Sequence, residues 1–142
     1  MTIAQALKEK NKRVANIQKG WEKIAKYNSL NEGVERPYSL TNIYESIAIE
    51  TAALIELKKA IHEASAPVRG DIFALSEYKN IAARIKTIDV SQGPVSERYS
   101  STVTVRSCEF DVKWQDSEIA AIENKIESIQ EKLDSFNHTN HI

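Results

Sequence analysis

The sequence has little of what disulfides, phosphate-binding loops and membrane spans require. Its 142 residues include one cysteine, Cys108, so an internal disulfide is excluded and a reducing compartment is expected. Four glycines, none of them clustered, leave nothing to build a glycine-rich phosphate-binding loop. No stretch approaches the ~20 apolar residues of a membrane-spanning helix. The first residues also lack the apolar stretch of a secretory signal peptide, and we therefore expect a cytoplasmic protein.

The formal net charge is −1, which gives no overall field that would attract nucleic acid or an anionic membrane. The charge is nevertheless unevenly distributed. Residues 1–36 carry eight Lys or Arg against four Asp or Glu, whereas residues 109–142 carry three Lys against eight Asp or Glu. Opposite charge on the first and last predicted helices favours their lying side by side, within one chain or between two chains. Independently solvated faces are the alternative.

Apolar residues near the C-terminus recur at steps of 3, 4, 3, 4 and 3, the spacing of the a and d positions of a coiled coil. A stripe this narrow needs a partner surface, so it predicts an interaction seam. We call it the C-terminal seam, and it consists of Ile119, Ile122, Ile126, Ile129, Leu133 and Phe136.

Helical periodicity and turn signals predict a single domain over residues 1–142, with helices at about 3–28, 42–64, 71–89 and 112–136. Thr2 and Gln5 form a capping box at the first helix, and Asp111 and Asp116 are both candidate caps for the last. Between about residues 99 and 110 the period changes to two, which predicts one kinked strand or two short ones. The predicted fold is mainly α, an antiparallel bundle of coiled-coil helices with a short β-hairpin or ribbon before the last helix.

Residues that could carry chemistry are sparse, and we predict no catalytic, metal-binding or cofactor-binding residue. His138 and His141 are spaced like metal ligands, but no third ligand completes the set, which favours a solvated tail. The first helix carries a basic row that could contact phosphates, although Glu9 and Glu22 interrupt it. A solvated row, or one that faces an acidic helix, is the favoured interpretation. The row consists of Lys8, Lys10, Lys12, Arg13, Lys19, Lys23 and Lys26.

Four segments, in this order and spacing, resemble the bacterial septicolysin-like family of uncharacterised proteins. They are Ile3-Ala4-Gln5-Ala6-Leu7, Asn31-Glu32-Gly33 followed by Pro37, Arg98-Tyr99-Ser100 with Asp111-Val112, and Asn137 with Thr139 and Ile142. The chain departs from the family at His138, where the family usually has Trp, and at Ile61–Ser65, which replaces an Ile-Asn-x-Thr-Asn element. The resemblance implies a helical fold with a small β element and self-association, and no established reaction. The departures suit a divergent copy carried by a bacteriophage or another mobile element.

These observations predict a non-enzymatic structural or protein-interaction role for a homo-oligomer, with no nucleic acid or membrane partner. An adaptor that binds another protein through the C-terminal seam is the alternative. A further alternative, motivated by the family name alone, is a membrane-active cytolysin-like protein or, if the chain is phage-encoded, a component of the virion.

Overall fold

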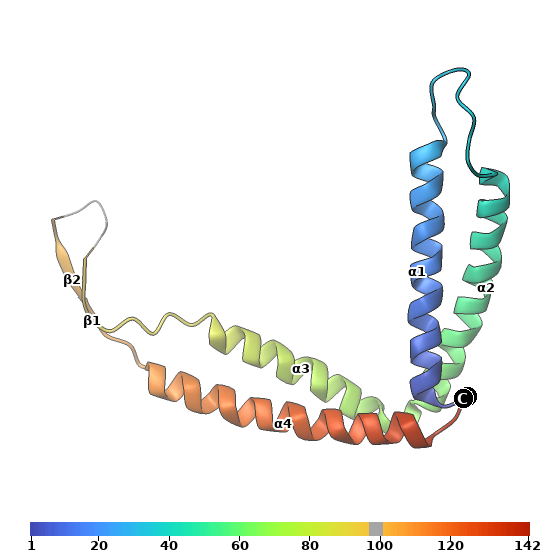
Figure 1. Ribbon diagram of the computed structural model, residues 1–142. Coiled ribbons are helices and arrows are strands. Elements are labelled where there is room, and N and C mark those ends of the chain that lie inside the picture. The colour runs from blue at the N-terminus through green and yellow to red at the C-terminus, as the bar shows by residue number, and fades with distance from the viewer. Residues whose placement is uncertain (97–100) are drawn as a thin grey trace. The chain divides into compact units, whose positions relative to one another are not determined.

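The computed structural model describes residues 1–96 and 101–142, and Figure 1 shows its helices and strands. It confirms the predicted fold class, a mainly helical chain with a two-stranded antiparallel hairpin before the last helix. The elements in chain order are α1 (Ile3–Tyr27), α2 (Leu40–Ala64), a 3-10 turn (Ala66–Val68), α3 (Arg69–Lys86), β1 (Gly93–Ser96), β2 (Val103–Arg106) and α4 (Val112–Thr139).

Contacts within the chain divide it into two compact units. Unit 1 is Met1–Val68 with Asp134–Ile142, and unit 2 is Arg69–Leu133. The single domain over residues 1–142 stays a prediction.

The helix bounds differ from the predicted ones by at most three residues. Helix α2 begins at Leu40 because the Ser39 hydroxyl accepts a hydrogen bond from the Asn42 backbone N–H at 3.3 Å. Of the two candidate caps of α4, Asp111 is the one used, since its Oδ1 accepts from the Trp114 N–H at 2.8 Å. Between α2 and α3 the predicted break around Pro67 is no longer than the 3-10 turn that precedes α3.

The β element departs most from the prediction of about 99–110. Gly93 and Pro94, residue types that signal the end of a helix, begin β1 instead. Gly93 has a φ of 85°, which favours glycine and lets the chain turn from α3 into the strand. The strands pair with Val95 opposite Thr104 and Ser96 opposite Val103. Residues 97–100, with Arg98-Tyr99-Ser100 of the family resemblance and the start of the predicted segment, lie outside the described residues.

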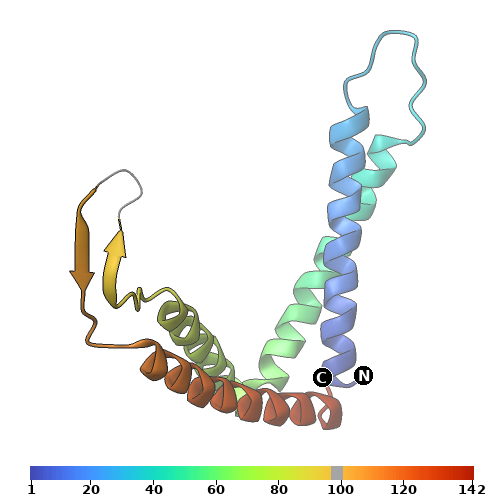
Figure 2. The same ribbon diagram turned by 60° about the vertical axis from the view of Figure 1, so that its left-hand side comes forward.

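Unit 1 is built on the antiparallel pair of α1 and α2, which lie side by side in Figures 1 and 2. The predicted capping box at the start of α1 is confirmed, with Thr2 N–H donating to Gln5 Oε1 at 2.9 Å and Gln5 N–H donating to Thr2 Oγ1 at 3.2 Å. The last residues of the chain close against this start, because Ile3 N–H donates to Asn140 O at 2.9 Å. The buried apolar side chains of this unit are Ile3, Ala6, Ile47 and Val68.

The two helices of unit 1 approach each other closely at Gly20. A Cβ atom placed on Gly20 would lie 2.8 Å from Ile47 Cγ1 and 2.9 Å from Ile47 Cδ1. Glycine therefore allows Ile47, only 6% exposed, to pack against the backbone of α1. The same glycine lowers the stability of the interior of α1 by about 1 kcal/mol relative to alanine.

Unit 2 is a hairpin of α3 and α4 whose connection carries the β1–β2 ribbon (Figure 1). Its core is formed by Ala82 and Ile85 of α3 and Ile122 of α4. Two ion pairs between the helices flank that core, Lys86 to Glu123 at 3.2 Å and Lys132 to Asp71 at 2.8 Å. Three of these four charged side chains are more than half exposed and Asp71 is half-buried, so the apolar contact determines the pairing more than the ion pairs do.

Alanine substitutions at two helical glycines test the close approach at Gly20. Gly70→Ala places a Cβ atom in open space, and we expect a gain in the free energy of unfolding of up to about 1 kcal/mol from helix propensity. Gly20→Ala should raise helix propensity by the same amount, but its Cβ atom would force Ile47 to move. We therefore expect the gain in the free energy of unfolding to be cancelled or reversed. Urea titrations followed by circular dichroism measure both, and equal gains at the two positions would contradict the close packing at Gly20.

Candidate interaction surfaces

The C-terminal seam lies along α4, and its first half packs against α3 of the same chain. Ile122 is 8% exposed in the core with Ala82 and Ile85, and Ile119 and Ile126 pack against this core from either side. The sequence shows that the seam needs a partner, and the structure supplies α3 as that partner for these three residues. An interface with another chain through the seam stays a prediction.

The remaining seam residues are less uniform. Leu133 is 5% exposed, whereas Ile129 and Phe136 are half-buried. Phe136 belongs to the part of α4 that is assigned to unit 1, and its carbonyl accepts a hydrogen bond from the Asn140 side chain at 2.9 Å. The C-terminal seam therefore contributes to two local structures. Its first half packs in the α3–α4 pair, and its last residue lies where the C-terminus closes against the start of α1.

One polar side chain of this helix pair was not singled out by sequence reasoning. Gln115 Nε2 donates to two backbone carbonyls at the end of α3, Ile85 O at 2.8 Å and Ile88 O at 3.1 Å. These carbonyls lie in the last turn and just beyond it, where a helix lacks its regular donors, and Ile85 O also accepts from the Ile88 N–H at 3.1 Å. Gln115 thus fixes the end of α3 to the start of α4, and nothing in the sequence distinguishes it from a solvated glutamine.

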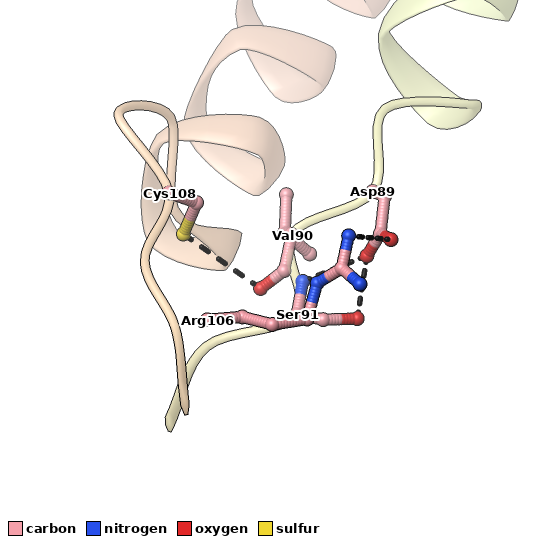
Figure 3. A network of polar contacts seen from close by, with 5 residues as sticks. All are labelled: Asp89, Val90, Ser91, Arg106 and Cys108. Atoms are coloured by element: carbon pink, nitrogen blue, oxygen red, sulfur yellow. Dashed lines mark hydrogen bonds and ion pairs between the residues drawn. The ribbon is translucent and has the colours of Figure 1, made fainter. Parts of the chain in front are cut away.

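A second polar network holds the base of the ribbon, and Figure 3 shows its residues. Asp89 Oδ1 accepts hydrogen bonds from the Ser91 hydroxyl and from the Ser91 backbone N–H at 2.9 Å, and its Oδ2 lies 3.8 Å from Arg106 Nη2. The pKa of Asp89 is lowered below its ordinary value. The largest cause is the hydrogen bond from the Ser91 hydroxyl, and the Ser91 N–H and the Arg106 charge act in the same direction. The half-buried Cys108 thiol lies 3.8 Å from Val90 O. The network connects the segment after α3 to β2.

The structure does not bring the histidines together with further ligands. His138 Nδ1 lies 2.7 Å from Asp134 O within its own helix, and His141 pairs with Thr2 in an isolated β-bridge. Across residues 1–96 and 101–142, no three His, Cys, Asp or Glu side chains lie close enough to hold a metal ion.

The basic row of α1 divides into two groups. Arg13 turns toward α2 and pairs with Glu50 at 3.0 Å and with Glu9 of its own helix at 3.3 Å. Lys10 is half-buried, and the other five side chains are exposed: Lys8, Lys12, Lys19, Lys23 and Lys26.

A groove of about 410 Å³ runs along the α1–α2 pair and is lined by both apolar and polar side chains, among them Ile43, Ile47, Asn16 and Glu50. A second hollow of about 250 Å³ lies between Lys19, Lys23, Tyr27 and Tyr38. The first groove also carries the Ser46 hydroxyl and the Glu50 carboxylate, and Glu50 pairs with Arg13 at 3.0 Å.

Comparison with family models, with curated proteins and with solved structures found no match to this chain. Among the helices in the described residues, none is both long and apolar enough to cross a membrane.

A charge placed at Ile126 tests whether α3 is the partner of the C-terminal seam. We expect Ile126→Asp to lower the free energy of unfolding of unit 2 by about 2–4 kcal/mol, because it sets a carboxylate against the Ala82–Ile85–Ile122 core. Thermal melting and hydrogen exchange of α3 amides measure the loss. Ser128→Asp adds the same charge at an exposed neighbour and serves as the control. Equal melting temperatures for the two variants would show that Ile126 faces solvent.

Titration of Asp89 tests the network at the base of the ribbon. A lowered pKa means that the Ser91 and Arg106 contacts favour folding above the ordinary pKa of the carboxyl, and that their contribution is lost as pH falls through the lowered value. We expect NMR titration to find the Asp89 pKa below about 3.9, the usual value for aspartate. Ser91→Ala should return it toward that value, since the largest cause is then removed. An unchanged pKa in Ser91→Ala would contradict the network.

Proposed function

We propose that this protein has a structural or protein-interaction role, without catalysis, and that it acts by associating with further copies of itself. The observation that carries the proposal is a set of exposed apolar side chains on α2, beside its contact with α1.

Helix α2 is apolar on two sides. One side contacts α1 through Ile43 and Ile47. Another side has Tyr44 at 58% and Ile55 at 52% exposure, with small side chains between them. The Tyr44 ring meets the ring of Trp21 of α1 edge-on, with the ring centroids 6.1 Å apart, so this end of the stripe borders the contact with α1. We call this side the outer α2 face, and it consists of Tyr44, Ala48, Thr51, Ala52 and Ile55.

The spacing of the outer α2 face is that of a helix that pairs with another helix. Its members follow one another at steps of 4, 3, 1 and 3, so they form one continuous stripe. Large residues at the ends and small ones in the middle allow a second helix to approach closely. A helix that associates with its own copy presents the same stripe twice, which meets the requirement of a two-fold symmetric interface.

The small core of each unit supports the same conclusion. Apart from four buried apolar side chains in unit 1 and four in unit 2, most apolar residues in the described ranges are partly or fully exposed. A unit with so few buried apolar side chains has marginal stability by itself. Oligomerisation is one of the ways in which such units gain stability.

The ribbon adds a second exposed apolar surface. Val103 and Val105 are 58% and 78% exposed, and Val105 stands opposite Pro94 on the same face. A two-stranded ribbon also leaves the outer backbone groups of both strands without a sheet partner. The ribbon therefore offers a further place for a second copy to pack.

The family resemblance agrees with self-association, and we propose the chain as a divergent member of the septicolysin-like family on the strength of the four segments given above. The adaptor alternative is less well supported, because α3 of the same chain covers the first half of the C-terminal seam. Leakage of dye-loaded liposomes would be the observation in favour of a membrane-active protein.

Lysine substitutions on the outer α2 face test the proposal. We expect Ala48→Lys/Ile55→Lys to weaken self-association by about tenfold or more, since it places charges inside an apolar interface while keeping good helix formers. Light scattering coupled to size-exclusion chromatography measures the mass over a range of concentrations. The control Glu45→Lys/Glu63→Lys puts lysines at other exposed positions of the same helix. An oligomer that tolerates the first variant as well as the control would rule out this face.

A further inference from the structure

Four of the five exposed lysines of α1 form a straight stripe. Successive steps of 7, 4 and 3 residues keep them on one side of the helix, over about 21 Å of its length. We call them the lysine stripe, which consists of Lys12, Lys19, Lys23 and Lys26. Lys23 Nζ lies 4.4 Å from the ring centroid of Tyr38 and Lys26 Nζ lies 5.2 Å from that of Tyr27. In the described part of the chain, none of the four forms an ion pair with a carboxylate.

Exposed carboxylates of α4 form a stripe of the same kind in unit 2. Their steps are 7, 4 and 4 residues, which again keeps them on one side, over about 23 Å. We call them the acidic stripe, which consists of Asp116, Glu123, Glu127 and Glu131. Glu123 pairs with Lys86 of α3 at 3.2 Å, on the edge of the stripe nearest to α3. The seam residues Ile122 and Ile126 point to α3, so the acidic stripe lies on another side of the helix.

The two stripes match when the helices run in the same direction. Aligning Lys12 with Asp116 also aligns Lys19 with Glu123 and Lys23 with Glu127, and brings Lys26 within one residue of Glu131. Four opposite charges therefore meet along about 21 Å in a single parallel register.

Connectivity determines which chain can supply the parallel partner. Ile3 N–H donates to Asn140 O at 2.9 Å, and Ile142 N–H donates to Met1 O at 3.2 Å, so α4 ends where α1 begins. An α4 that runs parallel to α1 along its length therefore has to come from another copy.

We infer that the lysine stripe of one copy lies along the acidic stripe of a second copy, with α1 and α4 parallel and in the register given above. This inference rests on the proposed self-association. Exposed ion pairs contribute little affinity each, so the stripes select the partner helix and its register, whereas apolar surface supplies the affinity. The e and g charges of coiled coils have the same role.

Charge reversal tests the inference, because two repelling variants should attract each other. We expect Lys23→Glu/Lys26→Glu and Glu127→Lys/Glu131→Lys each to weaken self-association by about tenfold or more, since each brings like charges together. An equimolar mixture of the two should associate as the wild type does, and the variant with all four substitutions should do so alone. Sedimentation velocity measures association, and circular dichroism verifies that each variant is folded. Lys58→Glu/Lys79→Glu, a reversal at exposed lysines outside the stripe, is the control.

The other outcomes separate this inference from the proposed function. A wild-type protein that associates, together with variants that associate equally well, would overturn the stripes and leave self-association in place. If the fourfold variant associates as the wild type does but the mixture of the two double variants does not, the charged stripes meet within one chain. That result would overturn the inference. A short duplex DNA that binds the wild type, but not a Lys23→Glu/Lys26→Glu variant of unchanged mass, would make the lysine stripe a phosphate-binding surface. A monomeric wild type would overturn both proposals.

Discussion

The structure depends on how little of a helix a single neighbouring helix can cover. In each unit two helices meet along one line, through Gly20 and Ile47 in unit 1 and through Ala82, Ile85 and Ile122 in unit 2. Such a contact buries one stripe of each helix and leaves the other sides to solvent. Where those other sides are polar, as on the outward side of α4, their exposure to water has little cost in free energy. Where they are apolar, as on the outer α2 face, exposure to water is unfavourable.

This difference between the helices gives the protein its proposed role. The outer α2 face and the valines of the ribbon remain exposed at a cost in free energy that a second copy would remove. The charged stripes of α1 and α4 cannot supply much affinity, but they can decide which copies fit. Polar networks around Gln115 and Asp89 hold the end of α3 and the base of the ribbon in place.

Local sequence signals predicted the elements well, because the interactions that form them are local. The capping box of Thr2 and Gln5 and the cap at Asp111 are encoded within three residues of the atoms they bond. The first strand was not predictable in this way, since Gly93 and Pro94 end a helix in most contexts and form a strand here only because β2 pairs with them. The C-terminal seam showed the need for a partner, but not that Ala82 and Ile85 would be that partner. The donors of Gln115 reach carbonyls 27 and 30 residues away, and no local pattern encodes such a contact.

The mass of the protein in solution tests the central claim most directly. Sedimentation equilibrium of the wild-type chain, over about a hundredfold range of concentration so that weak association is also detected, gives that mass without reference to shape. Our account predicts a multiple of the 16.0 kDa chain that forms reversibly as concentration rises. A mass of 16.0 kDa at every concentration would contradict it.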